Sequence, residues 1–245
     1  MMLKKWEELP SEMQTAEVKR YYDILQKKQS SLFLKRMFDI AVSSIMLIIL
    51  SPVFLILAIV IKIDSKGPVF YRQVRVTQYN KRYRIFKFRS MCQGADRGSQ
   101  VTVNQDARVT HVGRVIRNCR LDEISQLIDV FRGTMTFVSV RPEIPKYTEQ
   151  YTPEMMATLL LPAGITSLAS ILYKDEAKLL DGVEDTDKVY VEQILPAKMH
   201  YNLEQMEQFS LWNDIKLMFM TVLAVFGKEY KSNYMTEENK EKVEM

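Results

Sequence analysis

The chain has 245 residues, 47% of them hydrophobic and 26% charged, and its formal net charge is +4. This balance predicts a globular body with an anchor and excludes a protein made mainly of membrane-spanning segments. The first residues lack the short apolar core of a signal peptide. The two cysteines, Cys92 and Cys119, have no CxxC spacing. We therefore expect neither a zinc site nor a cysteine–histidine nucleophile pair.

The N-terminal segment is amphipathic. Apolar residues recur between polar ones from Met13 to Leu34, a pattern that fits a helix lying on lipid headgroups. A surface helix packed on the globular body fits equally well. We assign residues 1–36 to this amphipathic or interfacial segment and leave the two alternatives open.

The stretch Ile40–Ile61, IAVSSIMLIILSPVFLILAIVI, contains no charged residue. As one helix it would be about 33 Å long, enough to cross the hydrocarbon core once. Pro52, however, lacks an amide hydrogen and bends a helix, while the Ser51 hydroxyl can bond a carbonyl that the proline leaves free. Each half is then about 12 residues, too short to cross. A kinked spanning helix remains the alternative.

Basic residues flank this stretch on both sides. Lys27, Lys28, Lys35 and Arg36 precede it, and the segment Lys62–Arg89 holds nine lysines and arginines against the single acid Asp64. Because Lys and Arg mark the cytoplasmic side, both flanks are expected there. Residues 37–63 are therefore predicted to form a re-entrant helix–break–helix that enters one leaflet and returns. The basic cluster suits anionic headgroups or phosphate-bearing substrates better than nucleic acid.

Residues 64–200 are predicted to form a small cytoplasmic catalytic domain. SKGPVFYRQVRV and KRYRIFKFRSM are rich in β-branched and aromatic residues and predict a short β-hairpin. Its turn, Thr77–Asn80, offers Asn80 for a positive φ angle. The polar stretch Gln93–Ala107 is expected to be a mobile loop over a site.

Several helices should complete an α+β, mostly helical fold. The apolar stripe of Leu121–Phe131, ended by Gly133, predicts a helix. Helices are also expected at Met155–Leu161, Thr186–Leu195 and Leu203–Phe226. The last of these either packs on the core or rests against the membrane. Residues 201–245 form a C-terminal helix and a charged tail, which we expect to be frayed from Lys228 onward.

An acid pair, Asp122 and Glu123, lies at the start of the predicted Leu121–Phe131 helix. Acids in a first turn are commonly there because the helix dipole stabilises them. Here, however, arginines surround the pair in sequence: Arg108, Arg114, Arg117, Arg120, Arg132 and Arg141. A carboxylate held ionised among arginines can attack phosphorus or bind Mg²⁺. No P-loop or GxGxxG spacing is present.

Taken in order, four motifs resemble one family. They are KRMFDIAVSSIMLIILSPVFLILAIVIKIDSKGPVFYRQVRV, KFRSM, VGRVIRNCRLDEISQLIDVFRGTM and RPE. Together they resemble the bacterial sugar transferases that are monotopic phosphoglycosyl transferases, over roughly Leu34 to Ala169 and more loosely in SLWNDIKLMFMTV. The resemblance implies transfer of a sugar phosphate from a UDP-sugar to polyprenyl phosphate, with release of UMP. This would begin exopolysaccharide, capsule or other surface glycan synthesis.

The resemblance also implies a location and partners. The enzyme would be monotopic on the cytoplasmic face of the bacterial inner membrane, with membrane lipids as partners and no nucleic acid. The resemblance places the break of its re-entrant helix at Ser51 and Pro52. A homodimer is compatible with the sequence, and the sugar is not revealed by it.

The resemblance gives roles to site residues. Asp122 would attack the sugar-bearing phosphorus and form a covalent phosphosugar intermediate, and Glu123 would support the metal or orient Asp122. Mg²⁺ would be the cofactor, with Asp122 and Glu123 as its ligands. The predicted phosphate contacts are Lys87, Arg89, Arg117 and Arg141.

Some positions depart from the family pattern. Arg120 replaces the usual serine before Leu-Asp-Glu, so a purely capping role for Glu123 is disfavoured. Ser139-Val140 replaces the usual Gly-Pro before Arg141, which could shift the loop that carries this arginine. The altered loop favours one alternative, a weak or inactive relative that serves as a membrane-bound partner of an active transferase. A second alternative is a single-pass anchored protein whose basic face binds lipid or nucleic acid.

Overall fold

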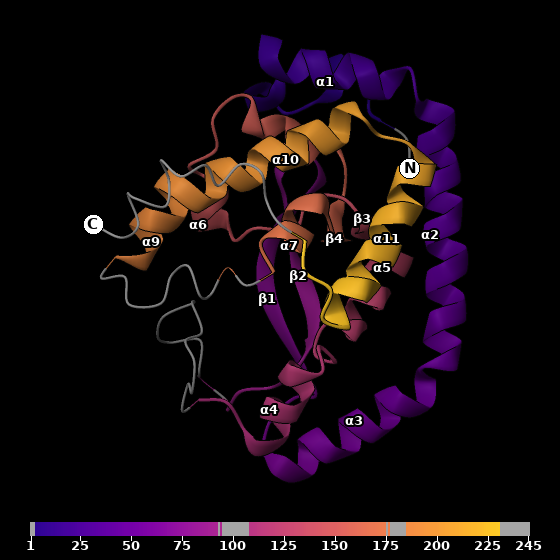
Figure 1. Ribbon diagram of the computed structural model, residues 1–245, viewed down its shortest axis with the longest axis vertical. Helices are drawn as coiled ribbons and strands as arrows, with labels where there is room; N and C mark the ends of the chain where they lie inside the picture. Colours follow the sequence, from indigo (N-terminus) through magenta and orange to yellow (C-terminus); the bar gives the residue numbers. More distant parts are fainter. Residues whose placement is uncertain (1–2, 93, 95–107, 175, 177–184, 231–245) are drawn as a thin grey trace.

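The computed structural model describes residues 3–92, 94, 108–174, 176 and 185–230. The expected loop Gln93–Ala107, apart from Gly94, and the tail beyond residue 230 lie outside these residues. Within the described part, helices dominate and the strands form two small two-stranded sheets (Figure 1). The mostly helical α+β character agrees with the prediction.

Helix α1 (Ala16–Gln26) lies across one end of the body (Figure 1). Its first turn is capped by Thr15, whose side chain accepts a hydrogen bond from a backbone amide. It packs against the 3₁₀ helix Met155–Leu160 and against α10 (Leu195–Glu207). The buried face consists of Val18, Tyr21, Tyr22 and Leu25. The structure thus shows α1 packed on the body, and contact of this segment with lipid headgroups stays a prediction.

Helix α2 (Gln29–Ile49) runs along the side of the body and meets α3 (Ser51–Asp64) at Leu50. The chain bends there by 60°. Pro52 stands in the first turn of α3, as proline does where it breaks a helix. The predicted break is confirmed. In the described part of the chain, no helix alone has the length and apolar character of a membrane span, whereas the bent pair has both when taken together.

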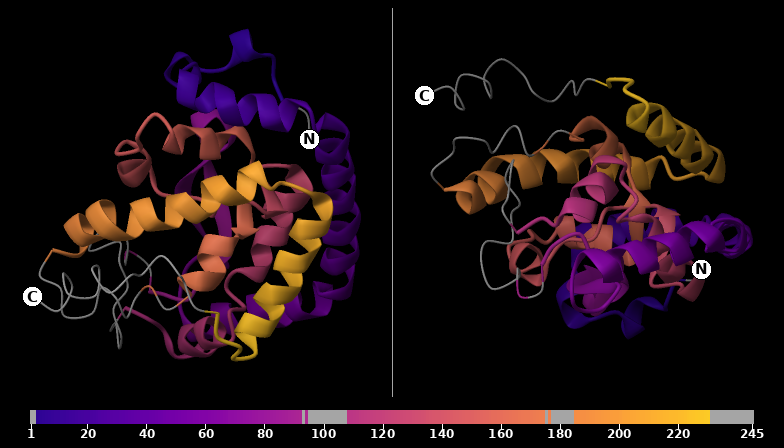
Figure 2. Two further views of the ribbon diagram at one scale, coloured as in Figure 1. Left: turned by 45° about the horizontal axis from the view of Figure 1, so that its top comes forward. Right: turned by 90° about the horizontal axis from the view of Figure 1, so that it is seen from below.

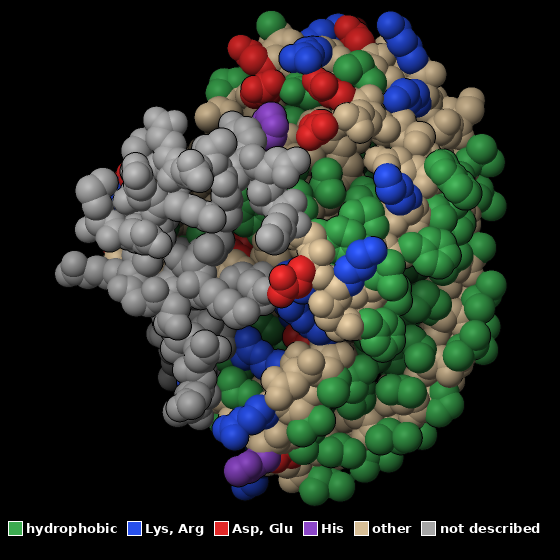
Figure 3. All heavy atoms as spheres, in the orientation of Figure 1, with side chains coloured by type: hydrophobic (Ala, Val, Ile, Leu, Met, Phe, Trp, Pro, Cys, Tyr) green, Lys and Arg blue, Asp and Glu red, His purple; other side chains and the backbone are tan. Residues whose placement is uncertain are grey.

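Apolar side chains cover the outer face of these helices. Figure 3 shows hydrophobic atoms gathered along the side formed by α2, α3 and α11 (Leu211–Val225). Exposed members include Ile48 and Ile49 of α2, Leu55 and Ile63 of α3, and Trp212 and Phe219 of α11. A contiguous apolar surface of this kind is typical of a membrane or protein contact.

The predicted β-hairpin is present. Strands β1 (Phe70–Thr77) and β2 (Lys81–Phe88) pair antiparallel, from Phe70 opposite Phe88 to Thr77 opposite Lys81. Asn80 has φ 57°, as expected, and Tyr79 before it has φ 59°. The turn therefore uses two left-handed residues, where the sequence indicated one.

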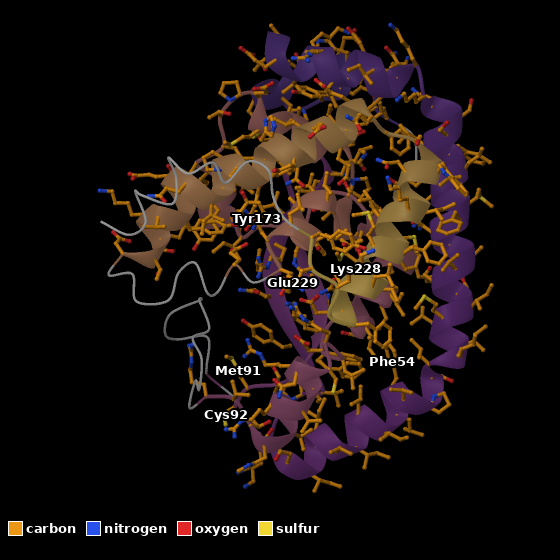
Figure 4. All side chains as sticks on the ribbon, viewed as in Figure 1. Phe54, Met91, Cys92, Tyr173, Lys228 and Glu229 are labelled. Carbon is orange, nitrogen blue, oxygen red and sulfur yellow. The ribbon has the colours of Figure 1, made fainter. Side chains whose placement is uncertain are left out.

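Helix α3 packs on the open end of this hairpin. Phe54 points from α3 toward the hairpin (Figure 4), and its ring meets that of Phe88 edge-to-face with centroids 5.1 Å apart. Phe70 lies 5.1 Å from Phe88 on the same end. Since Phe88 precedes Arg89 and follows Lys87, these contacts fix α3 relative to the predicted site.

A second sheet, which the sequence did not reveal, lies in the core. Strands β3 (Met135–Val138) and β4 (Ala163–Thr166) pair parallel. Helix α2 is joined to it by Asp39, which accepts hydrogen bonds from the Thr136 hydroxyl and the Phe137 amide. Helix α11 packs against α2 and against both strands (Figure 2).

Three predicted helices need correction. The Leu121–Phe131 helix begins three residues later, as a 3₁₀ turn Ile124–Gln126 followed by α5 (Leu127–Arg132). Gly133 ends it with φ 86°, as expected. Thr186–Leu195 divides into α9 (Thr186–Val189) and a π-helical turn. Leu203–Phe226 is broken between α10 and α11, where Ser210 caps the new helix.

Short elements fill the remainder of the described chain. The predicted helix Met155–Leu161 is present as a 3₁₀ helix, Met155–Leu160. The other α-helices of the described residues are α4 (His111–Asn118), α6 (Pro145–Thr148) and α7 (Leu168–Leu172). Of these, α4 leads directly into the acid pair Asp122 and Glu123.

Candidate active site

A tight turn after α4 presents the acid pair. Arg120 has φ 55°, and the Leu121 amide donates back to the Ile116 carbonyl at 2.8 Å. This is a Schellman-type ending, which usually places glycine at the left-handed position. The Phe88 amide donates to the Asp122 carbonyl at 2.9 Å. Asp122 and Glu123 thus lie in a turn fastened to the end of β2, before the 3₁₀ helix and outside any first helical turn.

Glu123 is the centre of an ion cluster. Its Oε1 accepts from Lys87 Nζ at 3.0 Å and from Arg141 Nη2. Burial disfavours the charged carboxylate, but Arg141 and Lys87 outweigh burial and hold the pKa of Glu123 well below its usual range. The side chain makes no capping hydrogen bond, as expected from Arg120, which stands three residues earlier in place of a capping serine. Glu123 is therefore an ionised anchor for two cations.

Asp122 has a different electrostatic environment. Burial and the neighbouring charge of Glu123 raise the pKa of Asp122, and the charges of Lys87 and Arg117 offset part of that rise. Arg117 is half-exposed in the last turn of α4. The two carboxylates thus differ. Glu123 is hydrogen-bonded by two cations and has a lowered pKa, whereas Asp122 has a raised pKa. Such divergent pairs are typical of reactive sites.

Arg141 reaches this cluster despite the altered residues before it. The Ser139 amide donates to the Thr166 carbonyl at 3.0 Å, and the Gly164 amide donates to Val140 at 2.8 Å. A Cβ on Gly164 would lie 2.1 Å from the Ser139 oxygen, so the close strand approach requires glycine there. Arg141 Nη1 then donates to Ile165 at 3.0 Å. The strand pairing, rather than a Gly-Pro turn, positions this arginine.

A small cavity of about 30 Å³ adjoins the cluster. Its lining consists of Arg75, Ile85, Lys87, Gln126, Arg141 and Pro142. This space admits a water molecule or a phosphate oxygen but not a sugar. Gln126 Nε2 is buried and has no hydrogen-bond partner within the described residues. Sequence reasoning did not single out Gln126 or Arg75, although Arg75 belongs to the basic cluster.

Arg89 is placed elsewhere. It is 5% exposed, and its Nη2 donates to the Ser65 carbonyl at 2.6 Å and to the Ile61 carbonyl at 3.3 Å. These contacts fasten the C-terminal end of α3 to β2 and do not join Arg89 to the acid pair. The geometry thus favours a structural role for Arg89, while Lys87, Arg117 and Arg141 surround the carboxylates.

The carboxylates can be tested for a metal site. Among the described residues, no group of three or more His, Cys, Asp and Glu side chains could hold a metal ion. Mg²⁺ commonly takes one or two carboxylates and completes its shell with water and substrate phosphates. Asp122 fits that donor set, with Glu123 beside it, although one Glu123 oxygen already bonds two cations.

Residues 30–228 match the family model of the bacterial sugar transferases, and the chain belongs to this family. It is 34% identical over 197 residues to a UDP-N-acetylgalactosamine-undecaprenyl-phosphate N-acetylgalactosaminephosphotransferase of Aeromonas hydrophila, covering 79% of this chain and 44% of the relative. It is 37% identical over 198 residues to a UDP-glucose:undecaprenyl-phosphate glucose-1-phosphate transferase of Klebsiella pneumoniae, covering 78% and 40%. The chain thus spans less than half the length of these relatives.

The match to another relative covers most of that relative's length but a smaller part of this chain. A putative undecaprenyl-phosphate N-acetylgalactosaminyl 1-phosphate transferase of Bacillus subtilis is 36% identical over 135 residues, covering 55% of this chain and 75% of the relative. Two of these three proteins name N-acetylgalactosamine and one names glucose, while undecaprenyl phosphate appears in all three names.

Proposed function

We propose that this protein transfers a sugar phosphate from a UDP-sugar to undecaprenyl phosphate and releases UMP. The observation that carries the proposal is Glu123, bonded by Lys87 and Arg141 beside Asp122. Cations gathered around a reactive carboxylate suit a phosphorus centre, where negative charge grows during transfer. Family membership and the names of the relatives support the same donor and acceptor classes.

The proposed chemistry has two steps. A carboxylate oxygen of Asp122 attacks the sugar-bearing phosphorus, and the bond from that phosphorus to the bridging oxygen of the UMP portion breaks. UMP leaves with that oxygen. A phosphate oxygen of the lipid acceptor then attacks the same phosphorus and frees Asp122. Lys87, Arg117 and Arg141 stabilise the phosphate charge, and Glu123 holds two of these cations in place.

Mg²⁺ is part of the proposal. Asp122 and Glu123 would hold it, and it would neutralise charge on the phosphate oxygens of the donor. UMP release should therefore stop in a chelator and resume with added Mg²⁺.

We propose that α2 and α3 form a re-entrant anchor on the cytoplasmic side of the membrane. Their bend and their exposed apolar residues support this. The lipid acceptor cannot leave the bilayer, so a site held at headgroup depth would meet its phosphate. The anchor would thus place Asp122 near the membrane surface, in a step that begins exopolysaccharide or capsule synthesis.

The test is a UMP-release screen across UDP-sugars with undecaprenyl phosphate and purified protein. Wild type should release UMP with at least one donor, and Asp122→Asn should not. Mass spectrometry of wild type with that donor alone should show a sugar phosphate on Asp122. Turnover without the adduct would favour direct transfer. No release with any donor would instead support the inactive membrane-bound partner suggested by Ser139-Val140.

A further inference from the structure

A buried cluster of charged and phenolic groups surrounds Glu143, two residues after Arg141. Tyr190 donates its hydroxyl to Glu143 Oε1 at 2.6 Å. Lys198 Nζ donates to the Tyr190 hydroxyl at 2.9 Å and to Glu143 Oε1 at 3.4 Å. Lys198 also donates to Glu176 at 2.9 Å. Glu143 and Lys198 are both buried, so this anion and cation depend on each other for compensation.

The backbone around Glu143 is fixed as well. The Glu143 carbonyl accepts from the Val76 amide of β1 at 3.0 Å. Arg75 Nη1 donates to the Pro142 carbonyl at 3.1 Å. The three residues Arg141 to Glu143 are therefore held at one end by the Glu123 pair and at the other by the Glu143 cluster. A shift of Glu143 would move Arg141, because one proline separates them.

The π-helical turn explains how Tyr190 and Lys198 come together. Eight residues of regular α-helix rotate the chain by about 80° beyond two full turns, so residues at this spacing are not aligned along the helix axis. One extra residue in a wider turn removes about 100° of that rotation and returns both to one face. The turn covers Tyr190–Ile194, and α10 continues from it. The irregularity thus serves the contact with Glu143.

A buried ion pair of this kind is a poor source of stability. Its desolvation cost offsets much of the attraction, so an apolar trio of equal volume would often be as stable. What the charged cluster provides is a defined place for the Glu143 carboxylate.

We propose that Lys198 and Tyr190 are positioning residues: through Glu143 and Pro142 they set the place of the Arg141 guanidinium against Glu123. The effect of this positioning on turnover rests on the proposed function. In this role neither residue needs to touch the substrate. They act on the cation that stabilises the phosphate charge, and a displacement of about 1 Å there would cost up to a hundredfold in rate.

The kinetic test uses the full chain in detergent or lipid. Lys198→Met should lower kcat about tenfold to a hundredfold, with KM for the UDP-sugar changed less. Tyr190→Phe removes one hydroxyl and should give a smaller loss in the same direction. Lys198→Arg should restore most of the rate. Lys188→Met is the matched control, since Lys188 is exposed on the preceding helix α9, and should leave kcat unchanged.

A double-mutant cycle separates positioning from general damage. If Lys198 acts through Arg141, then Lys198→Met should cost little more in an Arg141→Met background. Additive losses would overturn the proposal, as would a normal rate in both Lys198→Met and Tyr190→Phe.

A second readout does not depend on turnover. Phenylglyoxal modifies free guanidinium groups, and peptide mass spectrometry gives its rate at Arg141. Lys198→Met and Tyr190→Phe should raise that rate, and Lys188→Met should not. Faster modification in a protein that releases no UMP would refute the proposed function and leave the positioning role standing. An unchanged rate at Arg141 would refute the positioning role whatever the activity.

Discussion

The Ser51 hydroxyl donates a 2.8 Å hydrogen bond to the carbonyl oxygen of Ile48. Ile48 is the residue whose carbonyl would have accepted the amide hydrogen that Pro52 lacks. The bend between α2 and α3 therefore leaves this carbonyl with a partner, which matters most where no water is available. Serine and proline together make the break stable.

We predict that Pro52→Ala straightens the α2–α3 junction, because the missing amide hydrogen bond can then form. Some molecules should adopt a spanning topology. Labelling of cysteines introduced at Ser30 and Lys66, in a background lacking Cys92 and Cys119, would report the side of each flank. Ser51→Ala isolates the hydroxyl bond and should change topology less. Identical labelling of wild type and Pro52→Ala would mean that the bend has another cause.

A second prediction concerns the buried pair Lys35–Asp214, which joins α2 to α11 at 2.6 Å. The two side chains are 2% and 7% exposed. Lys35→Met should lower the free energy of unfolding by about 3–5 kcal/mol, because Asp214 is left as an uncompensated buried charge. Adding Asp214→Leu should recover most of the loss in denaturant melts.

The matched control is the exposed pair Lys19–Asp23 on α1, whose nitrogen and oxygen lie 2.9 Å apart. Lys19→Met should cost no more than about 0.5 kcal/mol. Equal losses for Lys19→Met and Lys35→Met would contradict the role of burial.

The Glu143–Lys198 pair predicts a pH window of stability. Burial opposes both charges, but Lys198 and the Tyr190 hydrogen bond lower the pKa of Glu143 below its ordinary 4.5, and Glu143 and Glu176 raise the pKa of Lys198 above 10.5. The lowered carboxyl stabilises the fold above pH 4.5 and loses this effect as pH falls through its folded pKa. The raised amine stabilises it below pH 10.5 and loses this effect as pH rises.

The measurement is the melting temperature of wild type against a Glu143→Gln/Lys198→Met double variant across pH. The pH-dependent part of their difference should be flat between these limits and should fall away at both ends. A difference that keeps changing steadily between pH 6 and 9 would show that other groups control it.

A fourth prediction uses the left-handed Arg120. The φ angle of Arg120 is 55°, so replacement by glycine should relieve a backbone strain of about 1–2 kcal/mol. Part of this gain is lost because glycine gives the unfolded chain more conformational entropy. Arg120→Gly should therefore leave the free energy of unfolding unchanged or raise it by up to about 1 kcal/mol. Arg114→Gly, at an exposed position inside α4, should lower it by about 1 kcal/mol. Equal losses for both would show that Arg120 makes a contact worth more than its strain.

Local chemistry explains which elements were predictable. The break at Pro52, the hairpin turn at Asn80 and the helix end at Gly133 each depend on one residue with restricted or permissive backbone geometry. The start of the helix after Glu123 was misplaced because its apolar spacing extends back to Leu121, whereas the Phe88–Asp122 backbone bond holds that part as a turn. The short parallel strands β3 and β4 have no alternation to reveal them, since nearly every residue is buried.

The residues of the candidate site could be proposed from the sequence, but their arrangement could not. Asp122, Glu123, Lys87 and Arg141 were identified by charge and resemblance. That Glu123 would bond both cations could not be read from spacings of 36 and 18 residues. Arg89 was expected to contact phosphate because it belongs to the basic cluster, and nothing in the sequence indicated its contact with Ser65.

The junction of α2 with the body bears on how this protein can be handled. Arg36 donates to the Val130 and Phe131 carbonyls at the end of α5, and Asp39 accepts from Thr136 of β3. Helix α2 thus supports strand β3, which leads to Arg141. A truncated, water-soluble version starting after Asp64 would strip polar partners from the core and should precipitate or remain inactive. Purification of this protein accordingly calls for a chain that keeps the helix.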